Sequence, residues 1–187
     1  MRHHRILILI ALAATLLLAA CAPGATFGKN PDLGSGAYAV QHFALAVDDA
    51  VVMPLESSYK VEAEDFTLVV TMRDTGFAII LTNKTDSNMT VNYDRSAASV
   101  RGLSSRVIPG NASWMTRNSP QPPSIALPDA TVFESLFLVE YMYFSSGIKF
   151  LPMFNEDPSQ KGNIVLSLAL EVNELPRTLT LTFSPKD

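Results

Sequence analysis

The chain has little cysteine and a deficit of positive charge. Cys21 is the only cysteine among 187 residues, so no disulfide can form within the chain. The antibody-type immunoglobulin core, which is built around a disulfide, is therefore excluded. Lysine and arginine number 14 against 18 acidic residues, which gives a net charge of −4. Because nucleic-acid binding depends on Lys and Arg side chains that neutralise phosphates, we expect no nucleic-acid partner.

The one long apolar run lies at the start of the chain. Arg2 and Arg5 enclose two histidines, and the run from Ile6 to Ala20 is apolar except for one threonine. It is shorter than the roughly 20 residues that a membrane-spanning helix needs. A basic start followed by such a run is typical of a signal peptide, so we expect residues 1–20 to be removed. Loss of the two arginines leaves 12 basic residues (14 − 2) against 18 acidic ones, a charge of −6. This charge gives no general attraction to anionic lipid.

The apolar run ends in Leu18-Ala19-Ala20-Cys21, which resembles the lipobox of bacterial lipoproteins. The resemblance covers the whole leader, and the alternative is an ordinary secretory signal with a coincidental cysteine. Membership would imply that the Cys21 thiol receives a diacylglycerol, that cleavage occurs just before it, and that the new amino terminus is acylated. Two or more acyl chains anchor a protein stably in a membrane, which would be the chain's membrane partner. Ala22 implies the outer membrane in bacteria with two membranes, and otherwise the outer face of the plasma membrane.

Residues 21–36 are rich in glycine and proline, and we expect them to form a flexible linker behind the anchor. They contain four of the nine glycines of the chain. A coil of about 15 residues has a mean reach of roughly 20 Å. The remaining residues, 37–187, have the length of one domain.

Strict alternation of apolar and polar residues dominates this domain. The runs that alternate are FTLVVTMR (66–73), FAIILTN (77–83), MTVNYD (89–94), NIVLSLALEV (163–172) and TLTLTFS (178–184). Each places its apolar residues on one face, which is typical of half-buried antiparallel strands. Turn-forming residues separate the runs, at 73–76, 83–88, 155–163 and 173–176. The sequence therefore predicts an all-β fold, an antiparallel two-sheet sandwich of immunoglobulin-like or transthyretin-like type.

One segment, Asp129–Phe144, leaves its secondary structure open. Val132, Leu136 and Val139 share a helical face behind a capping Asp129. Its content of Val, Phe and Tyr favours strands, and we expect strand or irregular edge structure here.

The stretch Gly76–Ser96 contains two Asn-x-Thr sequons, at Asn83 and Asn88, and a third sequon lies at Asn111. Since the leader indicates a bacterial protein, we attribute these residues to turn formation rather than to glycans. We expect strands Phe77–Asn83 and Met89–Asp94 to form a hairpin around the polar turn Lys84–Asn88.

Catalytic and metal-binding residues are scarce. After loss of the leader only His42 remains of three histidines, and the alternation of Val40–Val47 places it opposite the bulkier apolar face. We therefore expect an exposed or edge-strand histidine rather than a member of a Ser-His-Asp triad, and no zinc site. Asp86-Ser87-Asn88 offers calcium two oxygen ligands but lacks the rest of the loop pattern, so we expect no metal or other cofactor. Two distant carboxylates could still serve a hydrolase of surface polysaccharide, which stays an alternative.

The order of motifs in the domain resembles a group of uncharacterised bacterial envelope lipoproteins. The motifs are LTNKTDSNMTVNYDRSAASV (81–100), SSRVIPG (104–110), the proline-rich PQPPSIALP (120–128) and the final TLTLTFS (178–184). In that group the aromatic residue before the aspartate is often Trp, where this chain has Tyr93. The resemblance implies a single all-β sandwich over most of the mature chain and no particular activity.

Aromatic residues mark a candidate binding surface. Aromatics are enriched at interface cores, so we expect any binding surface to include Trp114, Tyr141 and Tyr143, together with Pro122 of the proline-rich loop. The alternative is ordinary core and edge packing. We expect a lipid-anchored cell-envelope protein with a non-enzymatic binding or structural role and an envelope protein as a candidate partner. A second alternative is an accessory subunit of an envelope assembly or secretion machine.

Overall fold

The computed structural model describes residues 35–48, 50–153, 162–172 and 174–186. The predicted leader, Cys21 and the predicted linker up to residue 34 lie outside these described residues. The described residues all belong to one compact unit, Pro31–Asp187. They are predominantly β-structure, with one short α-helix, α2 (Ser35–His42), and one 3-10 turn, η1 (Val139–Tyr141).

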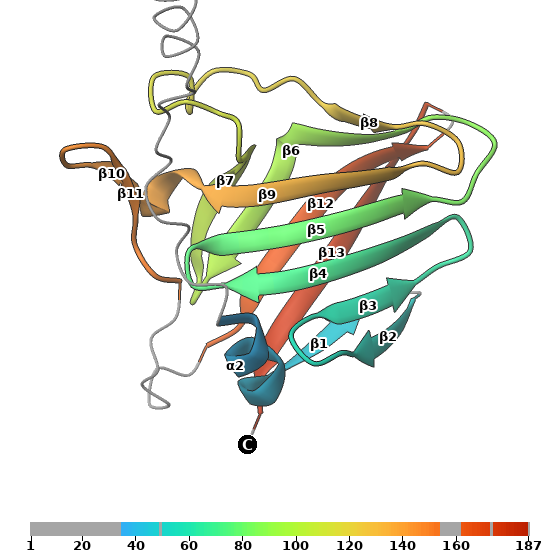
Figure 1. The fold of residues 1–187 in the computed structure, drawn as a ribbon, viewed down its shortest axis with the longest axis horizontal. Coiled ribbons are helices and arrows are strands. Elements are labelled where there is room, and N and C mark those ends of the chain that lie inside the picture. Colours follow the sequence, from blue (N-terminus) through green and yellow to red (C-terminus); the bar gives the residue numbers. More distant parts are fainter. Residues whose placement is uncertain (1–34, 49, 154–161, 173, 187) are drawn as a thin grey trace, which may run out of the picture. The chain divides into compact units, whose positions relative to one another are not determined.

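The strands are antiparallel, and they form one large sheet and one separate hairpin (Figure 1). In chain order they are β1 (Phe43–Val47), β2 (Val51–Pro54), β3 (Tyr59–Glu62), β4 (Phe66–Arg73), β5 (Gly76–Asn83), β6 (Met89–Val100), β7 (Leu103–Pro109), β8 (Ser124–Ala126), β9 (Thr131–Leu138), β10 (Met142–Phe144), β11 (Ile148–Phe150), β12 (Ile164–Val172) and β13 (Leu175–Pro185). The large sheet runs in the order β1-β13-β12-β6-β7-β9-β5-β4-β3-β2, with β8 added beside β6. It curls until it is nearly closed, like a barrel, and β10–β11 stand apart from it.

Strand β7 connects the two halves of the large sheet. Its first part pairs with β6, from Leu103↔Val100 to Arg106↔Ala97. Its second part pairs with β9, from Val107↔Leu138 to Pro109↔Leu136. The same strand therefore belongs to both halves, and β8 takes over beside the start of β6, where β7 has left it.

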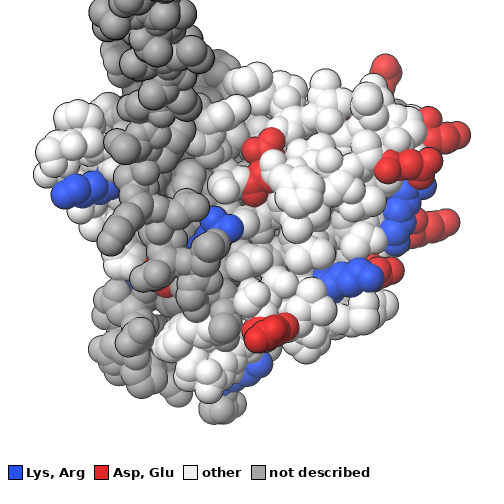
Figure 2. Space-filling view, viewed as in Figure 1, with Lys and Arg blue, Asp and Glu red and all other residues white. Residues whose placement is uncertain are grey.

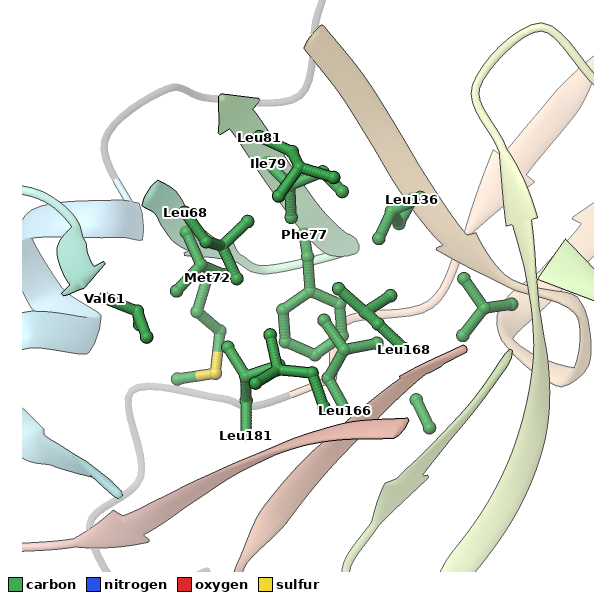
Figure 3. Packing of buried hydrophobic residues seen from close by; sticks show 14 of the residues in the cluster. Val61, Leu68, Met72, Phe77, Ile79, Leu81, Leu136, Leu166, Leu168 and Leu181 are labelled. Atoms are coloured by element: carbon green, nitrogen blue, oxygen red, sulfur yellow. The ribbon is translucent and has the colours of Figure 1, made fainter. Parts of the chain in front are cut away.

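The core lies between the two halves of the sheet. Figure 3 shows Phe77 of β5 pointing from one half toward Leu166 and Leu168 of the other. The predicted alternation is confirmed on every strand that it named, although Val172, at the end of its run, is only half-buried. The other apolar positions are buried in the core: Phe66, Leu68, Val70, Met72, Phe77, Ile79, Leu81, Met89, Val91, Tyr93, Ile164, Leu166, Leu168, Leu170, Leu179, Leu181 and Phe183. Burial of one large aliphatic or aromatic side chain contributes about 1.5–3 kcal/mol, so this face supplies most of the driving force for folding.

The hairpin β4–β5 contains a close approach between two backbones. Arg73 pairs with Gly76 across the turn, as the turn residues predict. Gly76 also pairs with Phe137 of β9. A Cβ atom at Gly76 would lie 2.1 Å from the carbonyl oxygen of Leu136. Only glycine fits this position without a shift of β9.

Residues 35–42 form a helix, where the sequence had predicted linker up to residue 36 and an extended strand from the alternation at 40–47. Helix α2 buries Ala39 completely against the core, with Tyr38 and Val40 partly buried. The small Ala39 side chain allows the helix to pack closely on the sheet. The alternation of apolar and polar residues contains no information about such packing. Strand β1 begins only at Phe43, and His42 is exposed at the end of α2, its ring 4.2 Å from that of Tyr38.

The predicted hairpin between residues 77–83 and 89–94 is wrong in its pairing, although both strands exist. β5 pairs with β4 and β9, whereas β6 pairs with β12, β7 and β8. The turn Lys84–Asn88 therefore crosses from one half of the sheet to the other. Alternation specifies which face of a strand is buried but not its neighbour, and both strands bury their apolar faces in the same core from different halves.

The ambiguous segment Asp129–Phe144 is mainly strand, as we expected. It forms β9, then η1, then β10. Asp129 is not a helix cap but a turn residue with a positive φ of 56°. The polar turn predicted at 155–163 lies almost entirely outside the described residues.

Candidate binding surface

A second, smaller apolar cluster lies on the outer side of β7 and β9. Ile108 and Phe137 are paired across these strands and face away from the main core. Ile108, Val139 and Met142 are buried in this cluster, with Trp114, Phe137 and Phe150 packed around them. The rings of Phe137 and Phe150 stack with centroids 4.2 Å apart and planes inclined by 20°. These contacts attach β10–β11 to the outside of the sheet.

The β10–β11 hairpin extends the apolar face of this cluster beyond the body of the domain. The Leu151 N–H donates to the Tyr141 carbonyl at its base (2.7 Å). Met142 pairs with Phe150, and one step further along Phe144 pairs with Ile148 on the same face, because residues two apart share a face. The first pair is buried or half-buried, whereas Phe144 is 62% exposed and Ile148 is 42% exposed. Tyr143 and Lys149 form the opposite face of the hairpin.

The loop that follows β7 places Trp114 against this hairpin. The Trp114 ring lies 6.1 Å from that of Phe144, and the Arg117 guanidinium lies 3.5 Å from the Trp114 ring centroid. Arg117 Nη1 also donates to the Trp114 carbonyl (2.6 Å), which holds the cation over the ring. Met115, next in the chain, is 90% exposed. We call the surface of this region the hairpin patch: it consists of the half-buried Trp114 and the exposed Met115, Tyr143, Phe144 and Ile148.

One ion pair and three hydrogen bonds hold the far end of the loop. Arg106 Nη2 lies 3.1 Å from Asp94 Oδ1 and its Nη1 donates to the Asn118 carbonyl (3.1 Å). The Gln121 N–H donates to the same Asp94 oxygen (3.1 Å), and its Nε2 donates to the Thr116 carbonyl (2.7 Å). The loop carrying Trp114 is therefore fixed to β6 and β7 before the chain enters β8.

Charge is distributed unevenly around the domain. In Figure 2 charged side chains of both signs gather at the right-hand end, where the connections β3–β4 and β5–β6 lie in Figure 1. The hairpin at the left is white with a single blue group. The two segments that build the hairpin patch, 111–123 and 142–153, contain Arg117 and Lys149 and no acidic residue. The hairpin patch is thus locally cationic on a chain that is acidic as a whole.

The structure places two of the four predicted site residues at the hairpin, Trp114 beside Phe144 and Tyr143 on the opposite face. Trp114 and Tyr143 belong to the hairpin patch. Tyr141 is half-buried against the main core instead, and Pro122 is exposed in the strand-like approach to β8, with no contact to the patch described. The sequence reasoning missed Ile148, Arg117 and the stacked Phe137–Phe150 pair. The available signal was Ser145-Ser146-Gly147 between two short apolar runs, a three-residue hairpin turn with positive φ at Ser146 and Gly147.

A buried polar chain runs from β6 to β9. Tyr93 OH donates to Ser124 Oγ (2.7 Å), and Ser124 Oγ donates to Glu134 Oε1. Burial raises the pKa of the Tyr93 phenol well above its usual range. The chain satisfies a phenol that is 1% exposed and ties β8 to both halves of the sheet. A serine bonded to a carboxylate has no imidazole base here, because His42 is exposed on α2.

The charged end contains a surface pocket of about 590 Å³, lined by Ala63, Glu64, Asp65, Lys84, Thr85 and Arg177. Its charges largely satisfy one another. Arg177 pairs with Asp65, and Lys84 donates to the Ala63 carbonyl (3.0 Å) and lies 3.6 Å from Glu62. A hydrogen bond from Lys60 lowers the pKa of the exposed Glu62 carboxyl. Within the described residues, no group of three or more His, Cys, Asp or Glu side chains could hold a metal ion.

The sequon residue Asn83 is a buried structural anchor. The two hydrogens of its Nδ2 are shared among the carbonyls of Ser87 (2.6 Å), Ala126 (3.1 Å) and Leu127 (3.1 Å), and its Oδ1 accepts from Thr85 N (2.9 Å) and Oγ1 (2.8 Å). With 0% exposure it leaves no room for a glycan, so its assignment to turn formation is confirmed. Asn88 and Asn111 are exposed.

Across the part of the chain that the structure describes, no helix has the length and apolar character to cross a membrane. No protein-family model matches the chain, no curated protein matches its sequence, and no solved structure matches its fold.

Proposed function

We propose that this protein is a lipid-anchored cell-envelope protein with a non-enzymatic binding role. The observation that supports the anchor is Leu18-Ala19-Ala20-Cys21, which places the single cysteine of the chain at the end of an apolar leader. Acylated Cys21 holds the protein in the outer membrane of a bacterium with two membranes, or on the outer face of the plasma membrane of a bacterium with one. We also propose that the all-β fold is of a particular type, a two-sheet sandwich of immunoglobulin-like or transthyretin-like kind.

The hairpin patch is the binding surface. It combines exposed aromatic and aliphatic side chains with Trp114, whose ring is covered by the Arg117 guanidinium. The hydrogen-bonded loop that contains Trp114 and the stacked Phe137–Phe150 pair hold these side chains in place. Preorganised aromatic anchors of this kind lose little side-chain entropy on binding. Neither the Tyr93–Ser124–Glu134 chain nor the charged pocket offers a comparable unpaired surface, because their polar groups are largely bonded to one another.

The anchor is tested by Cys21→Ser. Cells that produce the full chain are labelled with a radioactive fatty acid and then fractionated. We expect the wild type to carry label and to sediment with membranes, and Cys21→Ser to lose the label. A variant that keeps both its label and its membrane retention contradicts the anchor. Met115→Ser, which changes an exposed residue of the patch, serves as the matched control and should be labelled like the wild type.

A further inference from the structure

The shape of the hairpin patch restricts what it can bind. A specific protein interface buries about 800 Å² on each partner and is usually built around pockets. The β10–β11 hairpin is instead a narrow projection from the body of the domain (Figure 1), with Phe144 and Ile148 at its outer part. A narrow apolar projection fits a soft, deformable apolar phase better than a rigid complementary surface.

The chemistry of the patch matches the interface of a lipid bilayer. Trp and Tyr are enriched where membrane meets water, since their rings are apolar and their N–H and O–H groups are polar. Phe144, Ile148 and Met115 supply the apolar part, and Trp114 and Tyr143 supply the amphipathic rings. Arg117 and Lys149 lie beside them with no acidic residue in either segment, and each cation near an anionic leaflet adds attraction. The overall negative charge thus conceals a locally cationic apolar surface.

The position of the anchor allows this contact. Cys21 precedes the first described residue, Ser35, by 14 positions (35 − 21). Fully extended, 14 residues span at most about 50 Å. A domain of about 150 residues has a radius of gyration of about 15 Å, so the connection is long enough to let any face turn toward the membrane. Anchoring also raises the effective concentration of the patch at the lipid surface, so a weak contact is sufficient.

We propose that the hairpin patch docks onto the anionic lipid surface that holds the anchor, with Phe144 and Ile148 entering the interface and Arg117 and Lys149 facing headgroup phosphates. This inference rests on the proposed lipid anchor and names the partner of the same surface. Docking fixes the orientation of the domain, and the charged end, which lies away from the hairpin in Figure 2, then faces away from the bilayer.

Trp114 provides a direct test, because it is the only tryptophan in the chain. The full chain is produced in a bacterium, extracted in detergent and reconstituted into phosphatidylcholine vesicles that contain phosphatidylglycerol. Part of the phosphatidylcholine carries bromine near the headgroup end of its acyl chains. Flotation of the vesicles reports the anchor, and bromine quenching of Trp114 fluorescence reports the patch. We expect flotation with quenching, and weaker quenching when salt is raised or phosphatidylglycerol is omitted.

Ile148→Asp is the test variant and Leu175→Asp is its matched control. Both positions are exposed, but Leu175 (70% exposed) lies at the start of β13, near the charged end. We expect Ile148→Asp to float and to lose quenching, and Leu175→Asp to behave like the wild type. Far-UV circular dichroism checks that both variants keep the fold.

The outcomes are distinct. Flotation without quenching in the wild type, or equal quenching in Ile148→Asp, overturns docking and leaves the anchor intact. Absence of flotation overturns both proposals. If Trp114 stays accessible to aqueous iodide on the vesicles and becomes shielded only when solubilised envelope proteins are added, the partner is a protein and the lipid proposal is wrong.

Discussion

Removal of the Asn83 side chain should destabilise the domain far more than its position in a polar turn suggests. The side chain has five hydrogen-bond partners at 2.6–3.1 Å, three of which share its two N–H groups, and its contact with the Ala126 carbonyl is fully buried. An ordinary hydrogen bond contributes about 0.5–1.5 kcal/mol net, and a buried group left without a partner costs about 1–3 kcal/mol. We therefore expect Asn83→Ala to lower the free energy of unfolding by about 3–5 kcal/mol.

The assay is urea denaturation of the purified full chain in mild detergent, followed by far-UV circular dichroism. With a slope of about 2 kcal/mol/M, a loss of 3–5 kcal/mol moves the midpoint down by about 1.5–2.5 M. Asn83→Asp keeps the shape but directs oxygen instead of N–H at three carbonyl oxygens, so it should destabilise at least as strongly.

Asn111→Ala is the matched control, because Asn111 stands in the third sequon but is exposed. Its effect should stay within about 0.5 kcal/mol of the wild type. A loss below about 1 kcal/mol in Asn83→Ala would refute the reasoning, since the Asn83 network would then contribute no more than one ordinary bond.

Two further predictions concern packing and pH. Gly76→Ala should lower the free energy of unfolding by about 1–3 kcal/mol through the clash with the Leu136 carbonyl. In the same urea assay Gly102→Ala should lower it by only about 1 kcal/mol, because Gly102 lies in open space with a φ of 84°. Equal losses in the two variants would contradict the clash. Burial raises the pKa of the Tyr93 phenol in the folded protein, so as the pH rises the unfolded chain releases the phenol proton first, above about pH 10. The contribution of Tyr93 to the free energy of unfolding is therefore complete below that pH and falls by about 1.4 kcal/mol per pH unit above it. Tyr93→Phe should flatten this slope in unfolding measured from pH 9 to 11, and an unchanged slope would assign it to other groups.

The buried faces of the strands could be predicted from the sequence because they depend on local information. Alternation within FTLVVTMR or TLTLTFS is set by the two-residue period of the strand, and burial of Phe66 and Phe183 follows from it directly. The neighbours of each strand could not be predicted in this way. The crossing after β5 depends on Asn83 reaching carbonyls at Ala126 and Leu127, more than 40 positions further along the chain.

The hairpin patch was predictable only in part for a related reason. The sequence identified Trp114 and Tyr143 only as aromatic residues that could line a surface. The contact of Trp114 with Phe144 depends on the stacking of Phe137 with Phe150 and on η1, which turns the chain back over the outside of the sheet. Pro122 is close to Trp114 in sequence but is not part of the hairpin patch. The Gln121 N–H donates to Asp94, which holds this part of the chain beside β6.

The pairing of β1 with β13 has a consequence for the order in which the protein can fold. Phe43 lies opposite Pro185, 142 positions later (185 − 43). A chain that emerges from its amino end, from a ribosome or through a membrane pore, releases β1 long before the strand that it pairs with. During that interval β1 has unpaired peptide groups that can join other chains, and contacts between such distant residues form slowly. The large sheet is therefore completed late, and β1 stays open to pairing with other chains until β13 has emerged.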